Sequence, residues 1–105
     1  MMSLEFKKAI IELWINEFGA ERYALKSKIE GISVIDCYKI GGTYLRLDCF
    51  EAPKGGLIYC IEAANEEMAQ NNVFDDAWSY WDGDGIEKIL KDMKNDLSKE
   101  FELIG

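Results

Sequence analysis

The chain has 105 residues, 49% of them hydrophobic, which is enough apolar material for one core but not for two, so we expect a single domain over residues 1–105. Its formal net charge of −8 argues against nucleic-acid and membrane partners, and the absence of histidine argues against hydrolases and zinc sites. No apolar run reaches the length of a membrane span, the N-terminal residues do not read as a signal peptide and the three cysteines form no CxxC pair, so we expect a cytoplasmic protein with reduced thiols.

The first predicted element is an amphipathic helix over residues 4–18. Its apolar residues recur at steps of three and four, which is typical of one buried helix face: Phe6, Ile10, Leu13, Trp14 and Phe18. Ser3 is placed to cap the start of this helix, and Gly19 is placed to end it.

Alternating patterns rich in β-branched and aromatic residues follow. They predict strands at residues 32–40, 43–51 and 57–63. Residues 22–29 are a further candidate, because Lys26 and Lys28 alternate with apolar neighbours in the manner of a protected edge strand.

The connection between residues 52 and 56 allows the register of one hairpin to be predicted. Pro53 suits the first loop position, and Gly55 can supply the left-handed residue of a three-residue turn, which sets Ala52 opposite Gly56. One face then pairs Cys49 with Tyr59, Leu47 with Ile61 and Leu45 with Ala63, and the other pairs Arg46 with Glu62 and Phe50 with Ile58. A two-residue loop would set an apolar side chain against a carboxylate and is therefore disfavoured.

Residues 73–81 admit two interpretations. Phe74, Trp78 and Trp81 suit a helical turn, whereas Phe74, Trp78 and Tyr80 would share one face of a strand. The aromatic content and the short length favour the strand. The polar stretch at residues 65–72 is expected to be a linker.

The last predicted element is a helix that begins after Asp84, whose spacing to Glu87 resembles a capping box. Its apolar stripe consists of Ile86, Ile89, Leu90, Met93, Leu97 and Phe101. The whole pattern predicts an α+β fold, in which an antiparallel sheet of four to five strands carries the N-terminal and the C-terminal helix on one face.

No motif predicts catalysis, a metal or a cofactor. The string Asp82-Gly83-Asp84-Gly85 could open a calcium loop, but Ile86 and Met93 occupy positions where further ligands are needed, so a turn is favoured. The adjacent acid pairs at 66–67 and 75–76 would point to opposite faces of a strand and could not share a proton. Without a neighbouring histidine, the cysteines are expected to be structural. We therefore do not expect an enzyme.

Acidic residues are concentrated in one segment of the chain. Residues 51–84 contain eight acids and one base, and aromatic residues lie among them, a combination typical of a binding surface with anchors inside a charged rim. The residues predicted to meet a partner are Glu66, Glu67, Asp75, Asp76, Trp78, Tyr80, Asp82 and Asp84. Trp78 and Trp81 could equally fill the core, since a strand buries only one parity. The next candidate surface is the hairpin face that carries Tyr44, Arg46, Phe50 and Ile58.

The helical stripe of residues 6–18, the hairpin TYLRLDCFEAPKGGLIYCIEA, the segment VFDDAWSYWD and the closing helix GIEKILKDMKNDL occur in this order. In order and texture they resemble the small immunity proteins of bacterial polymorphic-toxin and contact-dependent growth inhibition systems, in particular the class called TriTu. The resemblance implies a cytosolic antidote that binds one cognate protein toxin, often a basic nuclease domain, and blocks its active site or substrate groove. The concentrated acidity suits this role, because complementary charge accelerates encounter. The alternative hypothesis is an acidic nucleic-acid mimic or adaptor that binds a DNA- or RNA-binding protein.

Overall fold

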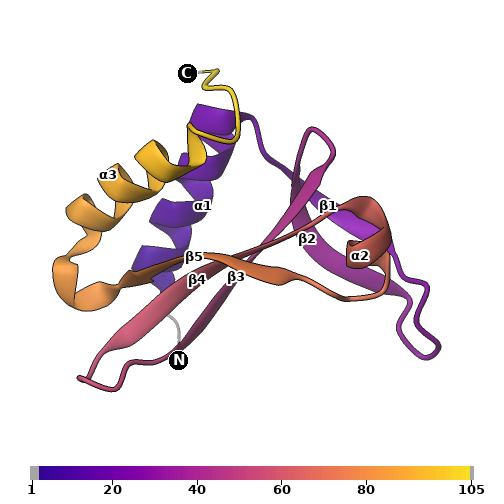
Figure 1. Cartoon of the computed structure of the whole chain (residues 1–105), viewed down its shortest axis with the longest axis horizontal. Coiled ribbons are helices and arrows are strands. Elements are labelled where there is room, and N and C mark those ends of the chain that lie inside the picture. Colours follow the sequence, from indigo (N-terminus) through magenta and orange to yellow (C-terminus); the bar gives the residue numbers. More distant parts are fainter. Residues whose placement is uncertain (1–2, 105) are drawn as a thin grey trace.

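The computed structural model describes residues 3–104, and Figure 1 shows a twisted sheet with two long helices on one side. The elements are α1 (Leu4–Phe18), β1 (Glu21–Lys26), β2 (Val34–Ile40), β3 (Thr43–Glu51), β4 (Leu57–Ala64), α2 (Glu66–Gln70), β5 (Asp75–Trp81), the 3-10 turn η1 (Asp82–Asp84) and α3 (Ile86–Leu97). This arrangement confirms the predicted α+β class, with five strands and with α1 and α3 packed on the same face. Among the described residues, no helix combines the length and the apolar character needed to cross a bilayer.

The strands lie in the sheet in chain order, and every neighbouring pair is antiparallel. β1 is an edge strand, as predicted for residues 22–29, although it ends at Lys26 and leaves Lys28 outside. β5 forms the other edge, which confirms the strand interpretation of residues 73–81 over Asp75–Trp81. The pairing is uneven: β3 and β4 pair over eight residues, whereas β2 and β3 pair over three only, next to their hairpin turn.

The register of the β3–β4 hairpin is the predicted one. The Ala52 amide donates to the Gly56 carbonyl at 2.9 Å, and the Gly55 amide donates to the Ala52 carbonyl at 3.0 Å. Gly55 has a φ of 94°, the left-handed conformation that the three-residue turn requires. All five predicted pairs form: Cys49 with Tyr59, Leu47 with Ile61, Leu45 with Ala63, Arg46 with Glu62, and Phe50 with Ile58.

The ends of α1 are as predicted, but the start of α3 is not. Ser3 caps α1 by accepting a hydrogen bond from the Phe6 amide, and Gly19 ends it with a φ of 69°. The prediction that Asp84 caps the last helix is wrong, because η1 places Asp84 one residue too early. Gly85 occupies the cap position without a side chain, and its carbonyl accepts the Ile89 amide at 3.1 Å.

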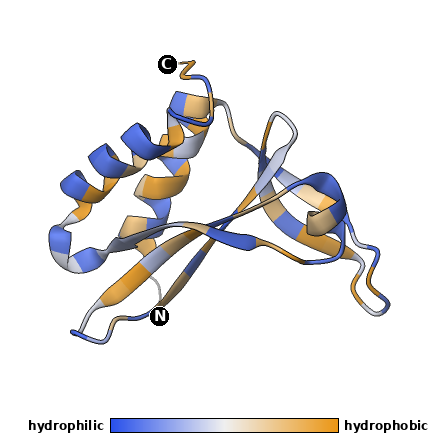
Figure 2. Ribbon diagram, in the orientation of Figure 1, coloured by the Kyte–Doolittle hydropathy of each residue, from blue (hydrophilic) through white to orange (hydrophobic). Residues whose placement is uncertain are grey.

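The main core lies between the sheet and the two long helices, where Figure 2 shows apolar residues facing inward and polar residues covering the outside of α3. Its buried members are Ile10, Trp14, Phe18 and Ala20 from α1 and its end, Leu45, Tyr59, Ile61 and Tyr80 from the sheet, and Ile89, Met93 and Leu97 from α3. Trp14 and Tyr38 meet edge to face, with ring centroids 5.7 Å apart.

A second, smaller cluster lies on the opposite face of the sheet, beneath α2. It consists of Leu25, Cys37, Tyr44, Ala64 and Ala69, with Met68 and Phe74 packed against it. The prediction of a linker at residues 65–72 is wrong here, because Asn65 caps a short helix by accepting the Met68 amide at 2.9 Å. Burial of Met68 and Ala69 then holds the helix on the sheet.

β5 contains an irregularity that changes which side chains share a face. Ile61 pairs with Trp78 and Glu62 pairs with Asp76, so Ala77 is an extra residue on β5. Phe74 consequently packs under α2, while Trp78 lies on the side of α1 and α3. The prediction that Phe74 shares a strand face with Trp78 and Tyr80 is therefore wrong.

Candidate functional site

The sheet face that points away from α1 and α3, which we call the outer face, carries an exposed apolar row. Phe50, Ile58 and Trp81 are cross-strand neighbours on β3, β4 and β5. Phe50 is 49% exposed and Trp81 is 36% exposed. The cluster beneath α2 involves the other end of the outer face, near Tyr44 and Ala64. The row therefore remains open to contact by another molecule.

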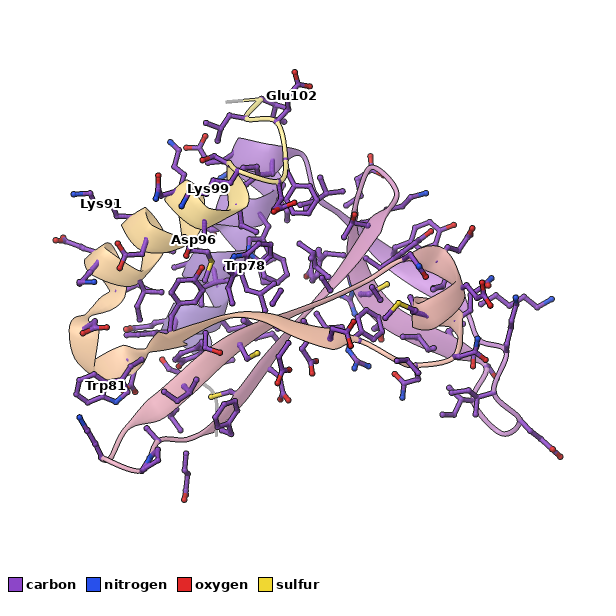
Figure 3. The ribbon with its side chains drawn as sticks, in the orientation of Figure 1. Trp78, Trp81, Lys91, Asp96, Lys99 and Glu102 are labelled. Atoms are coloured by element: carbon purple, nitrogen blue, oxygen red, sulfur yellow. The ribbon has the colours of Figure 1, made fainter. Side chains whose placement is uncertain are left out.

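The Trp81 side chain is held in place by the loops around it. Its Nε1 donates to the Gly55 carbonyl at 2.8 Å, and its ring lies so close to Gly83 that a side chain there would overlap it. Asp82 Oδ1 accepts the Leu57 amide at 3.0 Å and ties η1 to the same hairpin. Figure 3 shows Trp81 at this end of the molecule. A ring fixed in this way loses little entropy when a partner covers it.

Carboxylates occupy the two neighbouring rows of the outer face. One row contains Asp48, Cys60 and Ser79, and the next contains Arg46, Glu62 and Asp76. Burial raises the pKa of Glu62; Arg46, whose Nε lies 3.4 Å from Glu62 Oε1, opposes this rise, and the charges of Asp48 and Asp76 add to it. We call the apolar row Phe50, Ile58 and Trp81, together with the carboxylates Asp48, Glu62 and Asp76, the outer patch.

Arg46 marks the boundary between the outer patch and the cluster beneath α2. Its guanidinium lies 3.9 Å from the centroid of the Phe74 ring, and its Nη1 donates to Asn72 Oδ1 at 2.5 Å. Asn72 has a φ of 57°, a left-handed conformation that asparagine adopts more readily than most residues. The charge of Arg46 offsets that of Glu62, whereas Asp48 and Asp76 have no ion-pair partner within residues 3–104.

A polar hollow of about 520 Å³ continues the outer patch around the β5 edge towards α3. Its lining includes Ile58, Ser79, Tyr80, Trp81, Asp84, Asp92, Asn95 and Asp96. Lys88 Nζ lies 2.6 Å from Asp92 Oδ2, and the Tyr80 hydroxyl donates to Asp96 Oδ2 at 2.8 Å. Asp84 has no ion-pair partner within residues 3–104.

Trp78 and Tyr80, the two aromatic residues predicted to meet a partner, do not lie on the outer face. Tyr80 is 7% exposed and its hydroxyl is used by Asp96, so its assignment as a partner contact is wrong. Trp78 is half-buried against the main core, on the side of the two long helices, as Figure 3 shows. The bulge at Ala77 sets this parity, and it leaves Trp81 as the tryptophan of β5 on the outer face.

The six acidic residues predicted to meet a partner are distributed along the length of β5. Glu66 and Glu67 are exposed in the first turn of α2, and Asp75 and Asp76 are exposed at the start of β5. Asp82 and Asp84 lie beyond its other end. Seven strand residues span roughly 23 Å, so these groups form an acidic border and not a compact cluster.

The string at residues 82–85 forms a turn, as favoured over a calcium loop. Asp82 is half-buried and bonded to the hairpin backbone, and Asp84 ends η1. Within the described part of the chain, no three Cys, Asp or Glu side chains lie close enough together to hold a metal ion.

The three thiols are free, and their surroundings do not favour a nucleophile. Cys37 and Cys60 are buried, and Cys49 is half-buried. Burial raises the pKa of all three thiols, so little thiolate is present near neutral pH.

The exposed row was only partly visible in the sequence. Phe50 and Ile58 were identified as neighbours on the face opposite Leu47, but Tyr44 on the same face is buried beneath α2. Trp81 could join them only once the bulge in β5 was known, and no residue in this segment signals that bulge. Comparisons with protein-family models, with curated proteins and with solved structures found no significant match to this chain.

Proposed function

We propose that this protein is an immunity protein that binds and neutralises a cognate protein toxin, with a basic nuclease domain as the expected target, through the outer patch. The observation that supports this most is the exposed row Phe50, Ile58 and Trp81 bordered by carboxylates. Large apolar side chains in the centre and charges at the rim are the usual anatomy of a protein-binding surface. The toxin as partner comes from the resemblance of the sequence to immunity proteins.

The acidic residues are not needed for ion pairs inside the protein. Of the eight acids in residues 51–84, only Glu62 has an ion-pair partner within residues 3–104. Unpaired carboxylates repel one another in the free protein, so their concentration in one segment favours a role in binding. A basic partner would be attracted over long range, and its association would slow as salt is added.

We assign different roles in binding to the apolar row and to the acidic border. The apolar row, in which Trp81 is held in place, supplies contact area and limits dissociation, and the acidic border along β5 steers the partner and aligns it. Blocking the partner requires no chemistry by this chain, which agrees with the high pKa of its thiols.

The test uses Phe50→Ser, with Leu4→Ser as the matched control, because Leu4 is 82% exposed on α1, which packs on the face of the sheet opposite the outer patch. Tagged wild type and both variants are used to isolate partners from the native host. A partner bound by wild type and Leu4→Ser, but lost with Phe50→Ser, is then expressed alone and with each variant.

We expect the partner to arrest growth when it is expressed alone, wild type and Leu4→Ser to protect, and Phe50→Ser to protect less. A partner that is harmless when expressed alone contradicts the immunity role. A nucleic-acid-binding protein without toxicity would point to the adaptor alternative. Protection by Phe50→Ser equal to that by wild type would show that the outer patch is not the interface.

A further inference from the structure

The sheet divides between β2 and β3. The register pairs Tyr38 with Leu45, Lys39 with Tyr44 and Ile40 with Thr43, and there it stops. In the same register Cys37 would pair with Arg46, Asp36 with Leu47 and Val34 with Cys49, and none of these pairs forms. Figure 1 shows the two strands diverging below their hairpin turn, and we call the space between them the fork.

The β3 side of the fork presents unpaired backbone groups. In an antiparallel pair, hydrogen-bonded and non-hydrogen-bonded residues alternate. Because the Ala52 amide bonds the Gly56 carbonyl, the alternation directs the amides and carbonyls of Leu47, Cys49 and Glu51 away from β4 and into the fork. Asp48 Oδ1 accepts the Cys49 amide at 2.8 Å, which is consistent with that amide having no partner strand.

The β2 side of the fork is open in the same way. The Ser27 amide bonds the Ser33 carbonyl at 3.1 Å, and the alternation from this rung directs the backbone groups of Val34 and Asp36 away from β1. Val34 is 52% exposed, although it is β-branched and lies in a strand. Unpaired strand edges of this kind are templates for another strand.

A cavity of about 470 Å³ lies at the apex of the fork. Its lining consists of Lys7, Ile11, Arg22, Asp36, Cys37, Tyr38, Arg46 and Leu47. Three cations and one carboxylate line it, a balance opposite to that of the whole chain. Neither Lys7 nor Arg22 has an ion-pair partner within residues 3–104.

We propose that the fork binds an extended segment of another protein, which pairs with the free edge of β3 as an added strand and carries an acidic side chain to Lys7 and Arg22. β3 offers the longer edge, with three outward-facing residues against two on β2. The cationic lining selects an acidic segment through complementary charge. The added strand would lie beside Asp48 and Phe50 of the outer patch, but it would bond to the backbone of β3 and not to those side chains, so the inference does not depend on the proposed function.

The two outer edges of the sheet are poorer candidates for strand addition. Three of the six residues of β1 are charged, and β5 is interrupted by the bulge at Ala77. Charges and bulges are the usual protection of edge strands. The fork instead combines free backbone groups with a cavity.

The test measures amide hydrogen exchange by NMR in the whole protein, with a capped octapeptide of alternating glutamate and valine as the probe. The amides of Leu47 and Glu51 are expected to exchange rapidly in the free protein, and at least about tenfold more slowly at saturating peptide. An alternating lysine and valine peptide is the charge control. Lys7→Glu should weaken binding several-fold, whereas Lys8→Glu, which makes the same charge change outside the cavity, should not.

Four outcomes would overturn the proposal. Exchange of Leu47 and Glu51 that the acidic peptide leaves unchanged excludes an added strand on β3. Equal binding of the lysine peptide removes the charge selection. Displacement of the acidic peptide by inorganic phosphate, with the same shifts, identifies a site for small anions. Slower exchange at higher protein concentration without peptide identifies a second copy of the chain as the occupant.

Discussion

The hydrogen bond between Tyr80 and Asp96 joins β5 to α3. The hydroxyl donates to Asp96 Oδ2 at 2.8 Å, and Tyr80 is almost fully buried. Tyr80→Phe keeps the packing but leaves the carboxylate without its donor, so we expect a loss of about 1.5 kcal/mol in the free energy of unfolding at pH 7. Urea denaturation measures it, and Tyr23→Phe, on an exposed tyrosine, is the control.

The same pair predicts a pH dependence. Burial, followed by the hydrogen bond to Asp96 and its charge, raises the pKa of Tyr80 above that of an unfolded tyrosine. The folded state therefore holds this proton more tightly, and the contribution is complete below a pH of about 10 and is lost as the pH rises further. The difference in stability between wild type and Tyr80→Phe should narrow above pH 10. A constant difference would contradict the assignment.

Two glycines near Trp81 are expected to respond differently to substitution by alanine. At Gly83 an added methyl group would overlap the Trp81 ring, whereas at Gly55 nothing lies nearby and only the left-handed φ is strained. Gly83→Ala should therefore displace the ring, shift tryptophan fluorescence and break the bond to the Gly55 carbonyl. Gly55→Ala should cost about 1 kcal/mol without a spectral change. Identical spectra for the two variants would contradict the close contact between Gly83 and the Trp81 ring.

Among the elements, those with local signals were predictable from the sequence. Pro53 and Gly55 fix the turn between β3 and β4, and the turn fixes the register of the pairs that follow. The stripes of α1 and α3 are long enough for their period to be unambiguous. The position of the outer row on β3 and β4 follows from that register alone.

The remaining elements depend on tertiary contacts that no local pattern encodes. α2 is only five residues long, and it is stabilised by a cap and by burial of Met68 and Ala69 on the sheet. The bulge at Ala77 decides that Tyr80 is buried and Trp81 is exposed, which is why the candidate site was only partly predicted. The fork likewise has no local signal, because it forms where the pair β1–β2 parts from the pair β3–β4.

Arg46 connects three elements, so its substitution tests how α2 is held. Its guanidinium stacks on Phe74, bonds Asn72 and pairs with Glu62. Arg46→Met keeps part of the packing but leaves a half-buried carboxylate unpaired, and we expect a loss of about 2 kcal/mol at pH 7. Arg46→Lys should cost less, because it keeps the charge but loses the planar stack.

The sign of the pH effect separates the charge of Arg46 from its packing. Without Arg46, the pKa of Glu62 should rise further, so the folded state binds a proton more tightly than the unfolded state. The cost of Arg46→Met should therefore be greatest at neutral pH and shrink as the pH falls through the folded pKa of Glu62. Denaturation at pH 7 and pH 4.5 tests this. A pH-independent cost would assign the effect to packing alone.

Charge is distributed unevenly over the whole molecule. The cations Arg22, Lys26 and Lys39 lie on β1 and β2, whereas every charged residue in the segment from β4 to η1 is acidic. The two proposed surfaces follow this division, with the outer patch at the acidic end and the fork at the cationic side of β3. One small domain can thereby present surfaces of opposite charge preference.

The acidic border should lower the stability of the free protein while it serves binding. Asp75 and Asp76 are exposed, adjacent and without ion-pair partners within residues 3–104. Replacing both by asparagine should relieve repulsion and raise the free energy of unfolding by less than about 1 kcal/mol at low salt. The gain should vanish at high salt, where screening already weakens the repulsion.

The same variant should associate more slowly with the partner at low salt, and the rate should depend less on salt. The control replaces Glu100 and Glu102, both exposed near the C-terminus, by glutamine, which makes the same change in net charge. If only net charge matters, the two variants will be equally slow, and the acidic border has no directional role. A rate that falls only for the Asp75 and Asp76 variant places the steering charge along β5, because the control shares its net charge and differs in position alone.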